Sequence, residues 1–153
     1  KLAGPSDYVI GLLHLPSWGN DVLSWAPNGE IYRFKAVRTV GEKLAGPSFD
    51  VSGLLHLPSW GDDVLSWGRC GEIYRFKAGS SVGEKLERPS GDVRGRLHLP
   101  SWGDDVLSWG DRGEIYRFQA GSTVGEKLAG PSGNVDGFLH LPSWGGDVLS
   151  WGS

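Results

Sequence analysis

The chain has 153 residues and a mass of 16.5 kDa, enough to bury a core if its parts stack. Its formal net charge of −3 gives no electrostatic reason to expect a nucleic acid or an anionic membrane surface as partner. No apolar run approaches the roughly 18 residues of a membrane span, and the one cysteine, Cys70, excludes an internal disulfide. We therefore expect a soluble protein without membrane insertion, either secreted or cytoplasmic.

The sequence is an array of near-identical repeats. Three full units cover 1–42, 43–84 and 85–126, and a partial unit covers 127–153. The second and third units differ at nine of 42 positions, so the units must share one structure. A repeat this short cannot bury its own apolar face, and we expect neighbouring units to stack into a single repeat domain over 1–153.

The first part of each unit predicts little regular structure. In the first unit, residues 1–6 read as an extended piece broken by Gly-Pro. Residues 7–15 are apolar but contain Gly11 and precede Pro16, so we expect a short helix or an irregular connector there. Residues 18–20 form a turn.

The second part of each unit predicts a β-hairpin. Residues 21–25 are a short strand with apolar residues on both faces, as a strand buried between two layers needs. Residues 26–29 are the turn, in which Gly29 suits a positive φ. Residues 30–36 alternate, with Tyr32 and Phe34 on one side, and predict a half-buried strand.

Three strand candidates per repeat are typical of an all-β propeller. A β-trefoil also uses three units of about this length, but three units would end at Glu126 and the chain continues to Ser153. The fourth unit stops before its second hairpin strand, so four-fold closure is incomplete. We therefore expect four blades, with the N- and C-terminal segments sharing one of them and its missing strand absent or supplied by another chain. The protein would be a monomer or a homodimer.

The units resemble the hemopexin repeat. The resemblance rests on 21–25 (Asp-Val-Leu-Ser-Trp), the turn 27–29, 31–35 (Ile-Tyr-Arg-Phe-Lys), Leu-Pro-Ser at 15–17 and Gly-Pro at 4–5. It implies a four-bladed propeller in which backbone carbonyls near the inner-strand aspartates hold an axial calcium or sodium ion, with no cofactor required. These aspartates are Asp21, Asp63, Asp105 and Asp147.

The sequence departs from the hemopexin pattern in three ways. Val-Leu replaces an Ala-Ala pair, a Tyr-Trp-Arg run is missing, and the unit is shorter. A weaker similarity links the units to integrin-like lectin propellers, whose aspartate-rich calcium loop is absent here.

Each unit carries a histidine, a serine and an aspartate, at His14, Ser17 and Asp21 in the first. A hydrolase triad needs an asymmetric pocket with oxyanion donors, which four identical copies do not provide. We therefore expect no catalytic residues and no enzymatic activity.

The histidines occur once per unit, in Leu-His-Leu-Pro, at His14, His56, His98 and His140. They could converge on haem or a metal ion. The alternative is packing at a blade edge with one ring nitrogen bonded to backbone.

Two sets of tryptophans recur. The rings that end the inner strand, such as Trp25, are expected in the core. The other set follows Pro-Ser in a loop and comprises Trp18, Trp60, Trp102 and Trp144. An exposed ring there could stack on a sugar, whereas a buried one would be a wedge in the core.

Three functions follow from these patterns. A ring of equivalent shallow sites suits multivalent binding of glycans or glycoproteins, lined by the loop tryptophans and the histidines. The alternatives are a hemopexin-like carrier of haem, polyamine or a cation on the propeller axis, and a structural or designed scaffold without a natural ligand. Arg33 and its copies are expected to be exposed or to lay their stems over a neighbouring blade.

Overall fold

The computed structural model describes residues 2–48, 50–86, 92–129 and 133–152, and its regular structure is β-sheet with short 3-10 turns. The chain divides into two compact units, residues 1–86 and 87–153. Each compact unit holds two sequence repeats. The single domain over 1–153 stays a prediction.

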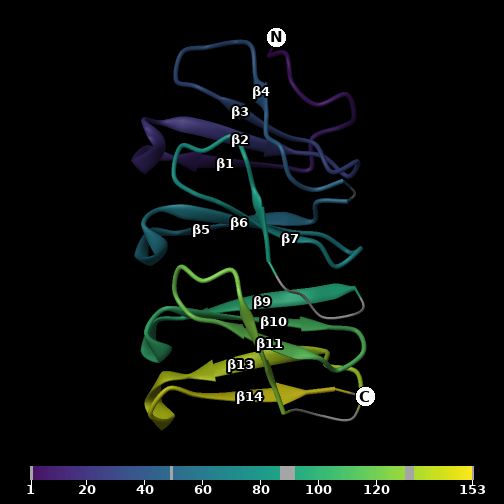
Figure 1. Cartoon of the computed structure of the whole chain (residues 1–153), viewed down its shortest axis with the longest axis vertical. Coiled ribbons are helices and arrows are strands. Elements are labelled where there is room, and N and C mark those ends of the chain that lie inside the picture. The colour runs from purple at the N-terminus through teal and green to yellow at the C-terminus, as the bar shows by residue number, and fades with distance from the viewer. Residues whose placement is uncertain (1, 49, 87–91, 130–132, 153) are drawn as a thin grey trace. The chain divides into compact units, whose positions relative to one another are not determined.

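Each of the first three repeats folds into a four-stranded antiparallel meander, in which consecutive strands are neighbours (Figure 1). The first sheet contains β1 (Gly11–Leu15), β2 (Asp21–Trp25), β3 (Ile31–Phe34) and β4 (Glu42–Lys43). The second contains β5 (Gly53–Leu57), β6 (Asp63–Trp67), β7 (Ile73–Phe76) and β8 (Glu84–Lys85). The third contains β9 (Val93–Leu99), β10 (Asp105–Gly110), β11 (Ile115–Phe118) and β12 (Gly125–Leu128). The fourth repeat contributes a two-stranded sheet of β13 (Gly137–Leu141) and β14 (Asp147–Trp151).

The predicted helix or irregular connector over 7–15 is wrong, because β1 occupies its second half. This strand pairs with β2 from Gly11 opposite Trp25 to Leu15 opposite Asp21. Gly11 misled the prediction because glycine weakens an isolated strand. Here its missing side chain makes room for the ring of Trp25, which a Cβ would overlap.

The inner strand is predicted correctly, and the next strand only in part. β2 spans the expected residues, and Gly29 has a φ of 86° in the turn that follows. β3 is shorter than predicted and is not half-buried, since Ile31 on one face and Phe34 on the other are 0% and 7% exposed. Both faces of this strand are therefore covered.

The fourth strand of the four-stranded sheets was not predicted, because it is short and charged. Lys43 of β4 is the first residue of the second sequence repeat, yet it pairs with Tyr32 in the sheet of the first. The structural repeat is therefore offset from the sequence repeat by a few residues.

Each β-hairpin of the first two strands turns through a short 3-10 helix. The four helices are Pro16–Trp18, Pro58–Trp60, Pro100–Trp102 and Pro142–Trp144. In the first repeat, Gly19 and Asn20 follow with φ values of 73° and 65°. The second of these positions holds Asn20, Asp62, Asp104 or Gly146, which are the residue types that tolerate a left-handed backbone. Within the described residues, no helix has the length and hydropathy that a membrane span requires.

The core of the N-terminal unit lies where its two repeats meet. Leu15, Trp18 and Leu23 of the first repeat share one buried cluster with Val51 and Leu54 of the second. The C-terminal unit repeats the arrangement, because Trp109 of the third repeat clusters with Val135 and packs its ring 4.6 Å from that of Phe138 in the fourth. The repeats within each unit therefore bury one another's apolar faces, as the sequence predicts.

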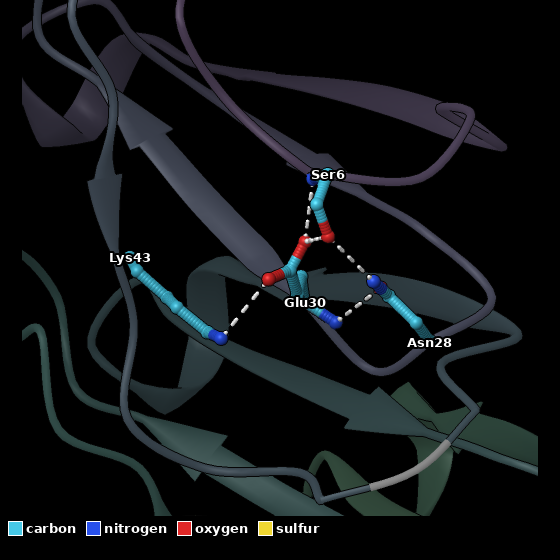
Figure 2. Close-up of polar contacts among 4 residues, drawn as sticks. All are labelled: Ser6, Asn28, Glu30 and Lys43. Carbon is cyan, nitrogen blue, oxygen red and sulfur yellow. Dashed lines mark hydrogen bonds and ion pairs between the residues drawn. The ribbon is translucent and has the colours of Figure 1, made fainter.

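A polar cluster fixes the N-terminal segment against the first sheet (Figure 2). The carboxylate of Glu30 accepts the backbone N–H of Ser6 at 2.7 Å, the Ser6 hydroxyl at 2.9 Å and the ammonium of Lys43 at 3.1 Å. Asn28 donates to Ser6 and accepts from the backbone of Glu30. The Ser6 backbone donor, followed by Lys43, lowers the pKa of Glu30 from 4.5 to about 2.

Replacing Gly53 by alanine should destabilise the N-terminal unit. A Cβ at Gly53 would overlap the ring of Trp67. Overpacking of this kind costs about 1–3 kcal/mol, measured as the change in free energy of unfolding by urea. The adjacent exposed Ser52→Ala is the matched control, and equal stabilities of the two variants would contradict the close packing.

The stabilisation supplied by Glu30 should depend on pH. Because its folded pKa is lowered, that stabilisation is fully present above its ordinary pKa of 4.5 and is lost as the pH falls towards about 2. In urea unfolding, wild type should therefore be more stable than Glu30→Gln at neutral pH, and the difference should shrink across this window. A difference that does not change with pH would show that the cluster is not formed by the carboxylate.

Candidate functional site

The predicted His, Ser, Asp and Trp residues gather where two consecutive repeats of one compact unit meet. In the N-terminal unit, Trp18, Asp21 and Arg33 of the first repeat lie against His56 and Asp62 of the second. We call these five residues the junction cluster.

Trp18 is the centre of the junction cluster. It ends the 3-10 helix between β1 and β2 and is 5% exposed. Its indole N–H donates to the backbone carbonyl of Asp62, 2.7 Å away in the next repeat. The guanidinium of Arg33 lies 5.5 Å from the centre of its ring, a cation–π contact. Trp18 is therefore placed as a wedge between repeats, and its ring is closed to solvent.

Arg33 ties the two repeats together through charged hydrogen bonds. Its Nε donates to Oδ2 of Asp21 at 2.6 Å, and its Nη1 donates to the carbonyl of Gly79 in the second repeat at 2.6 Å. The other oxygen of Asp21 accepts the backbone N–H of Ala36. The Arg33 side chain is 12% exposed and that of Asp21 5%. Of the two expectations for Arg33, reaching over the neighbouring repeat is the one the structure shows.

The histidine of the second repeat completes the cluster. His56 Nε2 lies 3.3 Å from the hydroxyl of Ser17 in the first repeat and 3.2 Å from Oδ1 of Asp62 in its own. It therefore sits at the repeat edge, where Ser17 and Asp62 are its side-chain partners. A bond between a histidine ring nitrogen and backbone stays a prediction. His14, at the equivalent position of the first repeat, is exposed.

The C-terminal unit repeats three of these contacts. The Ser101 hydroxyl lies 2.6 Å from Nε2 of His140, and the Trp102 indole N–H donates to the carbonyl of Gly146 at 2.5 Å. The guanidinium of Arg117 lies 5.2 Å from the centre of the Trp102 ring. The same contacts recur, so they belong to the repeat and not to one place in the chain.

The remaining predicted residues differ in their surroundings. His98 lies 3.2 Å from the Asp104 carboxylate, and Trp60 is 4% exposed. Trp144 is the exception among the loop tryptophans, with 62% of its surface exposed. The predicted sugar site, which needs accessible rings, stays a prediction.

Three of the four aspartates predicted to lie near an axial cation are held by arginines. Asp63 and Asp105 accept Nε of Arg75 and Arg117 at 2.6 Å, as Asp21 accepts Arg33. Asp147 is exposed. Among the described residues, no group of three or more His, Cys, Asp or Glu side chains is placed to hold a metal ion. The cation, haem and polyamine sites stay predictions.

In the first repeat, the serine and the aspartate of the suggested triad have other partners than His14. The hydroxyl of Ser17 faces the histidine of the following repeat, and the carboxylate of Asp21 faces Arg33. The spacing that suggested a triad thus reflects a contact between repeats.

Two hollows lie on the described surface, and the first of them borders the junction cluster at Arg33. One, of about 430 Å³ in the N-terminal unit, is lined by Arg33, Lys35, Arg38 and neighbouring residues. The other, of about 290 Å³ in the C-terminal unit, is lined by Arg94, Asp111, Asn134, Val135 and Asp136. Neither is lined by the predicted His and Trp residues.

The ion pair between Arg33 and Asp21 was not predicted from the sequence. The available signal was the constant spacing between an aspartate and an arginine, at Asp21 and Arg33 and again in each of the next two repeats. The hairpin of β2 and β3 pairs Leu23 with Arg33, which brings the arginine diagonally close to Asp21.

Comparison with known structures shows the fold. The crystal structure of the computationally designed Ika4 protein matches with a TM-score of 0.70, covering 99% of this chain and 94% of that chain at 16% identity. No protein-family model and no curated protein sequence matches the chain. The chain therefore has an all-β propeller fold built from four repeated blades. The resemblance to hemopexin repeats and lectin propellers finds no support in these comparisons.

The structure predicts a large loss of stability when Trp18 is removed and a small one when its counterpart Trp144 is removed. Trp18→Ala removes a buried ring and its hydrogen bond, and should cost about 3–5 kcal/mol of unfolding free energy. Trp144→Ala has the same local sequence but an exposed ring, and should change stability by about 0.5 kcal/mol or less in dilute solution. Unfolding by guanidinium chloride measures both. Equal losses would show that Trp18 is not a wedge between repeats.

Proposed function

We propose that the chain is a non-enzymatic propeller scaffold, in which the recurring His, Ser, Asp and Trp residues join one blade to the next. The observation that carries this proposal is the burial of Trp18 together with its hydrogen bond to the next repeat. A side chain used in this way is not available to a ligand. The same argument applies to Asp21, whose carboxylate is held by Arg33.

Two further observations support a scaffold. The contacts of the junction cluster recur in the C-terminal unit, where Trp102 donates to Gly146. A solved structure that the chain resembles is itself a computationally designed protein. A repeat that bonds to its neighbour through recurring residues such as Trp18 and Trp102 can be stacked without any ligand.

Carbohydrate binding and axial binding of haem, polyamine or a cation are the competing functions. Carbohydrate binding would have to use an accessible ring, and Trp144 offers one. Its three counterparts are more buried, so a sugar site there would be single and not a ring of equal sites. We therefore rank the scaffold above multivalent binding.

A glycan array and a haem titration test the scaffold proposal. The labelled protein should bind no sugar class on the array, with or without calcium, and haem should give no shifted Soret band. The Trp144→Ala variant is the control that separates specific from general adsorption. Binding to one sugar class that is lost in this variant would replace the scaffold with a lectin, and a Soret shift would replace it with a haem carrier.

A further inference from the structure

Equivalent apolar residues differ in exposure between repeats. In the N-terminal unit, Val51 and Leu54 of the second repeat are 0% and 9% exposed, because they lie in the cluster shared with the first repeat. Their counterparts in the first repeat, Val9 and Leu12, are 47% and 67% exposed. We call the side of a repeat that carries these two positions the leading face. In the second repeat, this side packs against the first repeat.

The opposite side of the fourth repeat is exposed in the same manner. Leu23 and Leu107 are 0% and 1% exposed, whereas their counterpart Leu149 is 46% exposed. Trp109 is 8% exposed, whereas its counterpart Trp151 is 53% exposed. We call this side the trailing face. It comprises Leu139, Trp144, Leu149 and Trp151.

We propose that the trailing face of one copy of this chain binds the leading face of a second copy, head to tail. The proposal goes beyond the scaffold function, because it adds a partner and an assembly. The occupant follows from continuity with the internal junctions, where a trailing face of this sequence is covered by a leading face of this sequence. Two apolar faces of this kind are unusual on the surface of a soluble monomer.

The polar groups of the two faces also match. At the internal junctions, the indole N–H of Trp18 or Trp102 donates to the carbonyl of Asp62 or Gly146. The corresponding acceptor of the first repeat is Asn20, whose φ of 65° equals that of Asp62. The loop therefore already has the conformation that receives a tryptophan. Between copies, Trp144 would donate to the Asn20 carbonyl.

A second polar pair supports the same register. Ser17 and Ser101 meet the histidine of the following repeat at the internal junctions. His14 on the leading face and Ser143 next to Trp144 are both exposed. They would form the corresponding pair between copies.

The leading face is also hollowed. A space of about 140 Å³ lies among Leu2, Gly4, Pro5, Val9, Leu12, Ser24 and Phe34. Apolar side chains of the trailing face would fill this space, as side chains of the first repeat cover Val51 and Leu54. The contact is heterologous, so it generates a closed ring where the rotation permits and an open filament otherwise.

Light scattering during size-exclusion chromatography of the full chain tests the proposal. The mass should be a multiple of the 16.5 kDa of one chain and should fall on dilution. A monomer at all concentrations up to about 100 µM, where a contact of even micromolar affinity would be saturated, would overturn it.

Single charges on each face separate head-to-tail binding from other associations. Leu12→Asp places a charge on the apolar leading face, and Leu149→Asp places one on the trailing face. Each substitution should prevent binding through its face, so each variant alone should be monomeric. A mixture of the two should give a one-to-one dimer, because each variant keeps the face that the other lacks. Val124→Asp is the matched control, since Val124 is 67% exposed and its counterparts Val40 and Val82 are exposed too. It should leave the mass unchanged.

The mixture also shows that the variants are folded, because only folded faces can complement one another. If either single variant keeps the mass of the wild type, or if the mixture stays monomeric, the head-to-tail contact is wrong. Contact between two like faces would leave one of the single variants fully associated.

Discussion

A single repeat of this sequence is too short to cover its own apolar face, and every other feature of the chain follows from that constraint. In the N-terminal unit, Trp18 and Leu23 of one repeat are buried only because Val51 and Leu54 of the next lie against them. An inner strand such as β6 is accordingly covered on both sides. Burial of this apolar surface is the main stabilising term, at about 25 cal/mol per Å².

The polar residues follow from the same constraint. A repeat that packs against its neighbour buries the ends of its strands, and the groups there need partners. Arg33 supplies them on both sides, since it binds Asp21 in its own repeat and the carbonyl of Gly79 in the next. Its planar guanidinium also covers the ring of Trp18. One arginine therefore couples a charge pair within a repeat to the contact between repeats.

The repeat and the inner strand were predicted from the sequence. A short segment such as 21–25, with apolar residues on both faces, indicates a buried strand. The prediction failed at β1, because Gly11 signals a break locally and only the packed ring of Trp25 shows why glycine is needed. The sequence indicated the right residue types for the junction cluster. The prediction placed them together within one repeat, whereas the structure brings them together from two. Ser17 meets His56 of the following repeat, and a partner so far along the chain is visible only after two repeats have been stacked.

Some positions hold the same residue in every repeat and others vary, and this difference indicates where a ligand-binding site is to be expected. Recurring residues such as Trp18, Trp102 and Arg33 make contacts between repeats, so we expect a ligand-specific site to draw on positions that differ. The hollow in the C-terminal unit does so, because its Arg94 and Asp111 correspond to Ser52 and Arg69 in the second repeat. The carboxylate of Asp111 also has one buried oxygen without a hydrogen-bond partner. Divergence at such positions can change what a blade binds while leaving the junctions, and therefore the fold, intact.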